Sequence, residues 1–270
     1  MIKQNMQEDF AMNQPLLELQ NLSLSYHTME GEVAALSDIS FSVREGEFVA
    51  VVGPSGCGKS TILNLISGLL PIEKGEIFFR GEKLSKDSPL NIGYMLQKDH
   101  LFEWRTVYKN IILGLEIRRQ MTPENLARAD ALIDQYGLSS FRDARPSQLS
   151  GGMRQRAALI RTMVLDPDLM LLDEPFSALD YQTRLSVADD IGTILRSAGK
   201  TAILVTHDIS EAVSMADRVI VLSSRPARIR TIIPISLSLG NTPRTPMTSR
   251  NAPDFKTYFN LIWKELHADA

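Results

Sequence analysis

Residues 53–61, GPSGCGKST, constrain this chain more than any other stretch of its sequence. An apolar run at 48–52 precedes them, and a mostly apolar run at 62–66 follows. A buried strand, a glycine-rich turn and the start of a helix, in this order, are the context in which the pattern GxxxxGK[ST] forms a phosphate-binding P-loop. The sequence therefore predicts a nucleoside triphosphate site. A glycine-rich turn that binds nothing is the weaker alternative, because the expected context is present on both sides.

The residue types of this loop suit an anion. Gly53, Gly56 and Gly58 permit backbone angles that are closed to other residues, so successive N–H groups can point at one phosphate at a helix N-terminus. Lys59 adds a mobile positive charge for the β- and γ-phosphates, and the Ser60 hydroxyl can reach a Mg²⁺ that bridges them. The residues predicted to contact ATP here are Gly53, Pro54, Ser55, Gly56, Cys57, Gly58, Lys59, Ser60 and Thr61.

Composition limits the possible classes of protein. With 270 residues, of which 44% are hydrophobic, the chain can bury a substantial core and is most simply one large domain with a subdomain. The net charge of −3 argues against nucleic acid bound through bulk electrostatic attraction. The lone cysteine, Cys57, excludes an intramolecular disulfide, and we interpret it as a small residue without a redox role.

The first fifteen residues show no apolar core of signal-peptide length, so we expect a flexible tail and a protein that stays in the cytoplasm. No window approaches the roughly eighteen consecutive apolar residues that a membrane-spanning helix needs. If this protein acts at a membrane, another chain must cross it.

Hydrophobic periodicity predicts the order of elements. Alternating residues at 16–26 and 33–43 indicate antiparallel strands, and 76–80 and 91–96 indicate further short strands. Between 97 and 165 apolar residues recur at helical spacing, which indicates an inserted helical subdomain. Strands and helices alternate again from 169 to 222, with strands at 169–173, 201–206 and 218–222, which indicates a parallel sheet.

The C-terminal part divides in two. Residues 223–253 contain five arginines and no acid, and we interpret them as a solvated, partly irregular segment rather than a membrane or partner patch. An amphipathic helix is expected to follow and to pack back on its own domain. Its apolar stripe is Phe255, Tyr258, Phe259, Ile262, Trp263 and Leu266.

An acidic pair follows the apolar strand LMLL at 169–172. Asp173 ends that strand, where its carboxylate can hold Mg²⁺ or a water bound to it. Glu174 could polarise an attacking water as a general base. A helix cap would be the favoured reading of this pair in a chain without a P-loop, so it is the loop that points to catalysis.

LSGGMRQR, residues 149–156, places Ser150, Gly151 and Gly152 where a helix begins. This is a second anion-binding helix N-terminus, built without a lysine. One triphosphate already has its cradle at 53–61, so the second turn is most economically explained if it serves a nucleotide held by another copy. That implies a dimer. Read alone, the segment would equally be an ordinary N-capped helix.

Taken together, these residues closely resemble the ATP-binding subunit of ABC transporters over nearly the whole chain, 16–266. LSGGMRQR looks like that family's own signature. The resemblance implies an α/β P-loop NTPase fold with a RecA-like parallel-sheet core, an antiparallel β subdomain and an inserted α-helical subdomain. It also implies that two copies bind two ATP molecules head to tail, each between one P-loop and the opposite signature.

The resemblance assigns four further roles. Tyr26 resembles the aromatic that stacks on adenine, although an early-strand tyrosine is also commonly a core residue. Gln97 resembles the glutamine that touches Mg²⁺ and water, which completes a metal set with Ser60 and Asp173. Asp180 looks like the residue that communicates across the dimer, and His207 like the histidine on the γ-phosphate. Alone, Gln97 and His207 would be ordinary structural residues.

The predicted organisation is a tail at 1–15, an ATPase domain at 16–235 with its helical subdomain at about 98–165, and a C-terminal extension at 236–270. Residues 103–118 and 206–229 are similar to importers for nitrate, alkanesulfonates, taurine and some pyrimidine precursors. Phe102 and Glu103 stand before Trp104 where a Leu and a Pro are more usual, at the place where such subunits receive the permease.

The resemblance implies ATP and Mg²⁺ as cofactors, a second copy and two permease subunits as direct partners, and an extracytoplasmic solute-binding protein as an indirect one. It implies a peripheral place on the cytoplasmic face of the membrane and no nucleic acid. A DNA-maintenance ATPase of the same type is the alternative, but those carry a long coiled coil before the signature, and too few residues separate Gln97 from Ser150. A ribosome-acting protein would need two such heads, and a P-loop kinase would leave LSGGMRQR unused.

Overall fold

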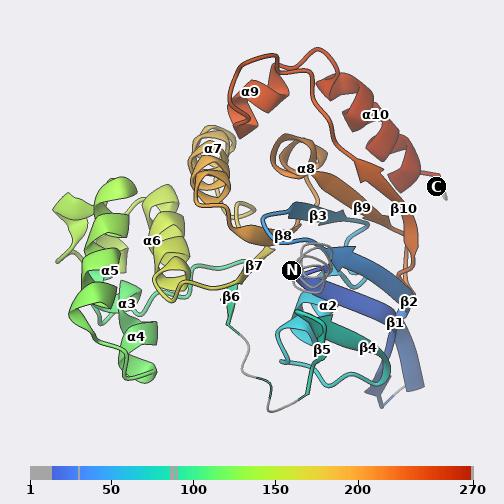
Figure 1. Cartoon of the computed structure of the whole chain (residues 1–270), viewed down its shortest axis with the longest axis horizontal. Coiled ribbons are helices and arrows are strands. Elements are labelled where there is room, and N and C mark those ends of the chain that lie inside the picture. The colour runs from blue at the N-terminus through green and yellow to red at the C-terminus, as the bar shows by residue number, and fades with distance from the viewer. Residues whose placement is uncertain (1–13, 30, 86–87, 89–90, 269–270) are drawn as a thin grey trace, which may run out of the picture.

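The computed structural model describes residues 14–29, 31–85, 88 and 91–268. Nearly all of the predicted tail at 1–15 lies outside the described residues. Figure 1 shows three parts: a central sheet, an antiparallel sheet at the lower right, and a group of helices at the left. The predicted fold class is confirmed.

The central sheet has six strands in the order β10-β9-β3-β8-β7-β6. All neighbours run parallel except β10, which is antiparallel to β9. The strands are β3 (Phe48–Val52), β6 (Ile92–Met95), β7 (Leu169–Asp173), β8 (Thr201–Val205), β9 (Arg218–Leu222) and β10 (Ile229–Pro234). Every residue of β3, β7 and β8 is buried, which explains why these strands appear in the sequence as continuous apolar runs.

The two faces of this sheet belong to two different cores. Along β3, Ala50 and Val52 join the core that includes the helices of the left-hand group, whereas Val49 and Val51 join the core shared with the antiparallel sheet. Because side chains alternate across a strand, one five-residue strand can connect both cores. The P-loop that follows Val52 is therefore fixed from both sides.

The antiparallel sheet has the order β2-β1-β4-β5. Its strands are β1 (Leu17–Thr28), β2 (Gly31–Val43), β4 (Lys74–Phe79) and β5 (Glu82–Lys83). The strands predicted at 16–26, 33–43 and 76–80 are confirmed, and the short β5 was not predicted. The sheet brings Tyr26 near the helix that follows the P-loop.

Helices α3 (Val107–Ile111), α4 (Leu113–Ile117), α5 (Pro123–Gln135) and α6 (Gly151–Met163), with short 3-10 turns at Ser139–Phe141 and Pro146–Gln148, form the left-hand group. Their starts are specified locally, since Thr106 and Thr122 accept hydrogen bonds as N-caps and Pro123 occupies the first turn. The inserted helical subdomain is confirmed, while its exact limits and the other domain boundaries stay predictions.

The remaining helices are α2 (Lys59–Ile66), α7 (Tyr181–Ser197), α8 (Ile209–Met215), α9 (Pro246–Arg250) and α10 (Phe255–Leu266). Helix α10 packs back on the core through the fully buried Ile262, as predicted. Trp263 departs from the prediction: it is 52% exposed and stacks between Phe259 and His267. None of the helices in the described part of the chain has the length and apolarity required to cross a membrane.

The arginine-rich segment is more ordered than predicted. Residues 229–234 form β10, which pairs with β9 through Ile232 and Ile233. Arg244 donates hydrogen bonds to Asp217 Oδ1 at 3.2 Å and to the carbonyl of Ala216. The prediction of a solvated segment is therefore wrong at the buried Ile233, while Arg244 is partly buried with carboxylate and carbonyl partners and most of 223–253 stays exposed or half-buried.

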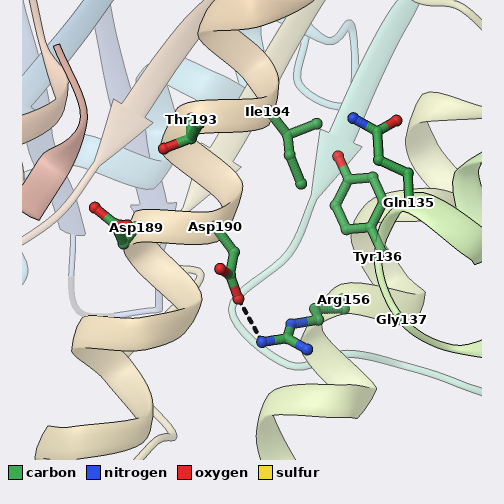
Figure 2. Close-up of a pocket in the computed structure, with 8 residues that line it drawn as sticks. All are labelled: Gln135, Tyr136, Gly137, Arg156, Asp189, Asp190, Thr193 and Ile194. Atoms are coloured by element: carbon green, nitrogen blue, oxygen red, sulfur yellow. Dashed lines mark hydrogen bonds and ion pairs between the residues drawn. The ribbon is translucent and has the colours of Figure 1, made fainter. Parts of the chain in front are cut away.

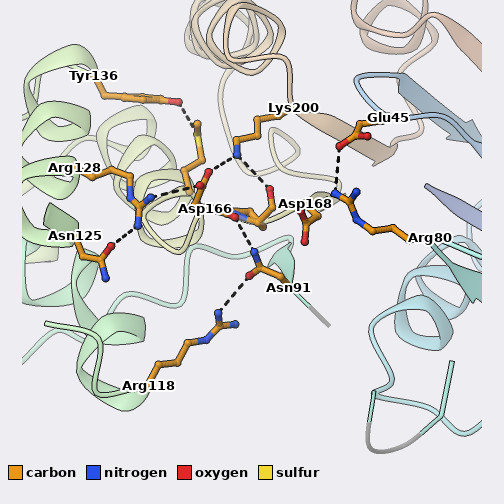
Figure 3. Close-up of polar contacts among 12 residues, drawn as sticks. Glu45, Arg80, Asn91, Arg118, Asn125, Arg128, Tyr136, Asp166, Asp168 and Lys200 are labelled. Carbon is orange, nitrogen blue, oxygen red and sulfur yellow. Dashed lines mark hydrogen bonds and ion pairs between the residues drawn. The ribbon is translucent and has the colours of Figure 1, made fainter. Parts of the chain in front are cut away.

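A polar network ties the parts together at the end of the sheet where β7 and β8 begin (Figure 3). Asp166 accepts a hydrogen bond from Lys200 and pairs with Arg128 of α5 at 3.4 Å. Arg80, which follows β4, donates to Asp168 at 3.0 Å. The hydrogen bond from Lys200 lowers the pKa of Asp166. The network thus joins the helical group and both sheets at the opposite end of β7 from Asp173.

Candidate functional site

The P-loop follows β3 and leads directly into α2, as predicted. Gly58 has φ +123°, and a Cβ there would lie 2.8 Å from Leu36 Cδ2. A Cβ at Gly53 would lie 2.9 Å from the sulfur of Cys57. Glycine is therefore required at Gly58 by conformation and at both positions by close contact. Cys57 itself is 1% exposed, and burial raises the pKa of its thiol, which fits a packing role.

Lys59 folds back over its own loop. Its ammonium donates hydrogen bonds to the carbonyl oxygens of Gly53 at 2.9 Å and Pro54 at 3.0 Å, and the residue is only 6% exposed. Neutral carbonyls partner this cation, so it has no carboxylate to neutralise it in these bonds. A phosphate in the loop would find a positive charge already in place.

The next residue of the loop meets the acid at the end of β7. Ser60 Oγ donates to Asp173 Oδ1 at 2.9 Å, although the two residues are far apart in sequence. Burial raises the pKa of Asp173, and the hydrogen bond from Ser60 opposes that rise. A hydroxyl and a carboxylate side by side are the hard oxygen donors that Mg²⁺ prefers, so these residues fit the predicted ion.

Glu174, Gln97 and His207 converge at one carboxylate oxygen. Glu174 Oε2 lies 3.3 Å from Gln97 Nε2 and 3.2 Å from His207 Nδ1. Gln97 also donates to Ser177 Oγ at 3.3 Å, so the amide faces the predicted base rather than Ser60 or Asp173. The roles assigned to these three residues, and that of Gln97 as a metal ligand, stay proposals.

Glu174 also has a strained backbone. Its φ is +45°, a left-handed conformation that costs a residue other than glycine roughly 1–3 kcal/mol. The surrounding structure holds it there: the Glu174 N–H donates to the Val205 carbonyl at 2.8 Å, and Ser177 Oγ donates to the Glu174 carbonyl at 3.0 Å. Strain of this kind that is held by neighbours is typical of functional positions.

The signature segment caps α6. Ser150 Oγ accepts a hydrogen bond from the Met153 N–H at 3.3 Å. A Cβ at Gly152 would lie 2.9 Å from Thr183 Cγ2, and one at Gly151 would lie 3.1 Å from Leu179 Cδ2. In the described part of the chain no hydrogen bond or ion pair joins 150–152 to 53–61. Within one chain, the two predicted anion sites are therefore not brought together.

Asp180 and Tyr26 have the exposure that their predicted roles need. Asp180 caps α7 by accepting from the Thr183 N–H at 3.1 Å, and hydrogen bonding by Thr183 lowers its pKa. Tyr26 is 37% exposed, and its hydroxyl shares a hydrogen bond with Thr61 Oγ1 at 3.0 Å. This tie orients the ring relative to the P-loop, which argues against the alternative of a buried core tyrosine.

Two residues near the site were not predicted. The Tyr94 hydroxyl donates to Asn64 Oδ1 at 3.0 Å and lies 3.4 Å from Asp173 Oδ2, and burial raises its pKa. Ser177 contacts both Gln97 and Glu174. A polar-tipped aromatic in a strand and a hydroxyl three residues after an acid were visible in the sequence, but nothing there paired them with the site.

A cavity of about 360 Å³ lies between the helical group and α7 (Figure 2). Arg156 of α6 pairs with Asp190 of α7 across it. The lining residues are Gln135, Tyr136, Gly137, Arg156, Asp189, Asp190, Thr193 and Ile194. None of them belongs to the predicted nucleotide site, so this cavity marks the boundary between the helical subdomain and the core.

Comparison with known proteins identifies the family. The family model for ABC transporters matches residues 36–177. An uncharacterised ABC transporter ATP-binding protein of Bacillus subtilis is 42% identical over 93% of this chain and 96% of its own length. An aliphatic sulfonates import ATP-binding protein of Bacillus licheniformis is 39% identical over 87% of this chain and 88% of its own. A taurine import ATP-binding protein of Pelagibacter ubique is 40% identical, covering 78% and 79%.

Solved structures match as well. The dimeric post-hydrolysis state of an ATP-binding cassette, bound to ADP and phosphate, superposes with a TM-score of 0.67 at 31% identity, covering 79% of this chain and 98% of that one. These relatives do not favour the alternative of a DNA-maintenance ATPase. This chain belongs to the ABC transporter family: it is an ATP-binding subunit of the ABC type, an ATPase whose cofactors are ATP and Mg²⁺.

Proposed function

We propose that this chain is the ATP-hydrolysing subunit that energises an importer for a small solute of the nitrate, alkanesulfonate, taurine or pyrimidine-precursor type. The observation that carries the proposal is the similarity, over most of the chain, to subunits named for taurine and aliphatic sulfonate import. The motifs at 103–118 and 206–229 support the same branch of the family.

Two copies close on two ATP molecules in this proposal. Each P-loop binds the phosphates of one ATP, with Lys59 beside them and Ser60, Asp173 and Gln97 around the Mg²⁺. Tyr26 stacks on the base. A bound Mg²⁺ would supply positive charge at the phosphates. Glu174 orients and deprotonates the water, and His207 stabilises the γ-phosphate. Ser150, Gly151, Gly152 and Asp180 of one copy complete the site of the other.

The shared site predicts a specific effect of Ser150→Arg. A single copy should bind ATP as before, because Ser150 makes no contact with the P-loop of its own chain. ATP-dependent dimerisation should be lost, since a long cation would occupy the space of the partner's phosphates. Light scattering with and without ATP measures this, with Glu174→Gln in the background to prevent hydrolysis.

Ser139→Arg is the matched control, since that exposed residue begins a 3-10 turn away from the helix N-terminus. Unchanged ATP-dependent dimerisation of Ser150→Arg would reject the shared-site model. Loss of ATP binding by its monomer would instead place Ser150 in the site of its own chain.

The route to the membrane partners is proposed to pass beside Gln97. Phe102 and Trp104 stack with ring centroids 4.7 Å apart, and Trp104 is 71% exposed. This aromatic pair lies close in sequence to Gln97, which contacts Glu174. Contact with two permease subunits on the cytoplasmic face of the membrane would therefore bear on the catalytic group, and a solute-binding protein outside would supply selectivity.

The test of the import function begins with the partners. The permease that co-purifies with this chain, and the binding protein that activates the complex, are reconstituted in vesicles. Taurine, an alkanesulfonate, nitrate and a pyrimidine precursor are then screened by thermal shift of the binding protein. One of these classes should raise its melting temperature and should stimulate ATP hydrolysis in the vesicles. A complex stimulated by none of them, or a chain that is activated by DNA instead, would contradict the proposal.

A further inference from the structure

The turn that carries His207 rests on a buried acid that has no place in the roles described so far. Glu211, in the first turn of α8, is only 4% exposed. Thr206, which follows β8 (Thr201–Val205) and precedes His207, is 1% exposed. The Thr206 hydroxyl donates to Glu211 Oε2 at 2.5 Å. Burial of a carboxylate is unfavourable, so its presence beside a candidate catalytic residue suggests a role there.

The Thr206 hydroxyl links the Glu211 carboxylate to the backbone of Asp208 through two hydrogen bonds. The Thr206 hydroxyl accepts a hydrogen bond from the Asp208 N–H at 3.0 Å and donates one to Glu211 Oε2. In an ordinary capping box, the acid at the third helical position reaches the N-cap N–H itself. Here the Thr206 hydroxyl is interposed between the acid and that N–H, so residues 206 and 208 are tied to one another.

His207 therefore lies between two residues, Thr206 and Asp208, that are both held in place by hydrogen bonds. On one side, the Thr206 N–H donates to the Val51 carbonyl of β3 at 3.2 Å. On the other, Asp208 Oδ1 accepts from the Ser210 N–H at 2.7 Å and the Glu211 N–H at 3.2 Å. Among the residues that the structure describes, the imidazole between these ends has one polar contact, Glu174 Oε2 at 3.2 Å.

A cation from α7 completes the cluster. Arg184 Nη1 lies 3.9 Å from Asp208 Oδ2, and its Nη2 donates to the Leu179 carbonyl at 3.2 Å. Leu179 immediately precedes Asp180, the residue proposed to communicate across the dimer. The titratable or charged groups near Glu211 are thus Asp208, Arg184 and His207.

We propose that Thr206 and Glu211 are positioning residues for ATP hydrolysis, which hold the 206–208 turn so that His207 meets Glu174. The pair does not touch nucleotide and acts only through the position of His207. This inference rests on the role proposed for His207 in catalysis. A displacement of about 1 Å at a reacting group can cost about 10²-fold in rate, so the loss of this support should appear in turnover.

The first test removes the hydroxyl and keeps the shape. Thr206→Val should lower kcat for ATP hydrolysis about 10- to 100-fold and leave the Kd for ATP within about twofold. Thr206→Ser, which restores the hydroxyl, should restore kcat. Ser214→Ala is the matched control: Ser214 of α8 is as buried as Thr206 and its hydroxyl donates to the Glu211 backbone carbonyl, not to the carboxylate, so this variant should keep the rate.

The second test changes the acid, and it stands alone if Thr206→Val does not fold. Glu211→Gln keeps an oxygen that can accept from Thr206 and should retain kcat within about threefold, whereas Glu211→Ala should lose as much as Thr206→Val. Wild-type turnover in Glu211→Ala, or a defect in Thr206→Ser equal to that of Thr206→Val, would overturn the inference.

A pH readout separates a charged buried Glu211 from a merely well-packed one. Burial raises the pKa of Glu211 from 4.5 to about 7. A carboxyl whose pKa is higher in the folded state stabilises the fold fully below pH 4.5, and this contribution is lost as pH rises toward 7. Urea unfolding between pH 5 and 8 should therefore show that wild type loses stability relative to Glu211→Gln as pH rises. Parallel curves would contradict a buried, titrating acid.

His207→Ala distinguishes failure of this inference from failure of the proposed site. If His207→Ala hydrolyses ATP at the wild-type rate, the role of His207 itself is rejected. If His207→Ala is slow while Thr206→Val is normal, only the positioning role falls. Slow turnover in His207→Ala and in Thr206→Val, with no further loss in the double variant, supports Thr206 acting through the position of His207.

Discussion

Glutamine in place of Glu174 is expected to lower the rate of ATP hydrolysis about 10²- to 10⁴-fold, the range that a positioned general base supplies. The amide has nearly the same size and can still accept a hydrogen bond, but it cannot take a proton from water. ATP binding should persist, because Glu174 is not part of the loop that cradles the phosphates. Phosphate release in a single turnover, together with ATP affinity measured by a fluorescent analogue, tests both halves of the expectation.

The surrounding contacts make this substitution a clean one. Glu174 Oε2 is approached by Gln97 and His207, and the left-handed backbone at φ +45° is held by the bond to Val205. The glutamine side chain alters none of the backbone contacts. Glu82→Gln, at an exposed position of β5, is the control for loss of one negative charge. A Glu174→Gln enzyme as fast as wild type would remove Glu174 as the base.

The sequence alone was enough to predict the parallel core. Strands buried on both faces are continuous apolar runs, and LMLL before Asp173 and FVAVV before the P-loop are two clear cases. Strand β10 was missed because its apolar residues, IRTIIP, stand among arginines and prolines. Its pairing depends on β9, a partner that the local pattern does not name.

Contacts between distant residues account for most of what the sequence could not supply at the site. Known motifs predicted that Ser60 and Asp173 would meet, and they do. No motif relates Tyr94 to Asp173, or Thr206 to a buried Glu211, since those contacts follow from how the strands and helices pack. The pattern also failed for Trp263. The apolar stripe predicts which face of α10 is buried, but not that Trp263 at the margin of that face is exposed.

Alanine in place of Lys59 is expected to abolish measurable ATP hydrolysis and to weaken ATP binding. A hydrogen bond to a charged group contributes about 1.5–3 kcal/mol, so ATP affinity should fall roughly 10- to 150-fold. The loss in kcat should be larger, because this charge also faces the negative charge that develops on the transferred phosphoryl group. Titration of nucleotide and steady-state phosphate release measure the two effects separately.

The contacts of Lys59 within its own loop decide how this variant should behave without nucleotide. Its ammonium is bonded to the Gly53 and Pro54 carbonyls, which are neutral acceptors, so removal of the side chain leaves no unpaired charge behind. Unfolding by urea should therefore change little, and the defect should be confined to ATP. Lys74→Ala, at the exposed first residue of β4, controls for lost positive charge and should keep both affinity and rate. Near-normal turnover in Lys59→Ala would mean that the loop's backbone N–H groups suffice for the phosphates, and the role proposed for this lysine would fall.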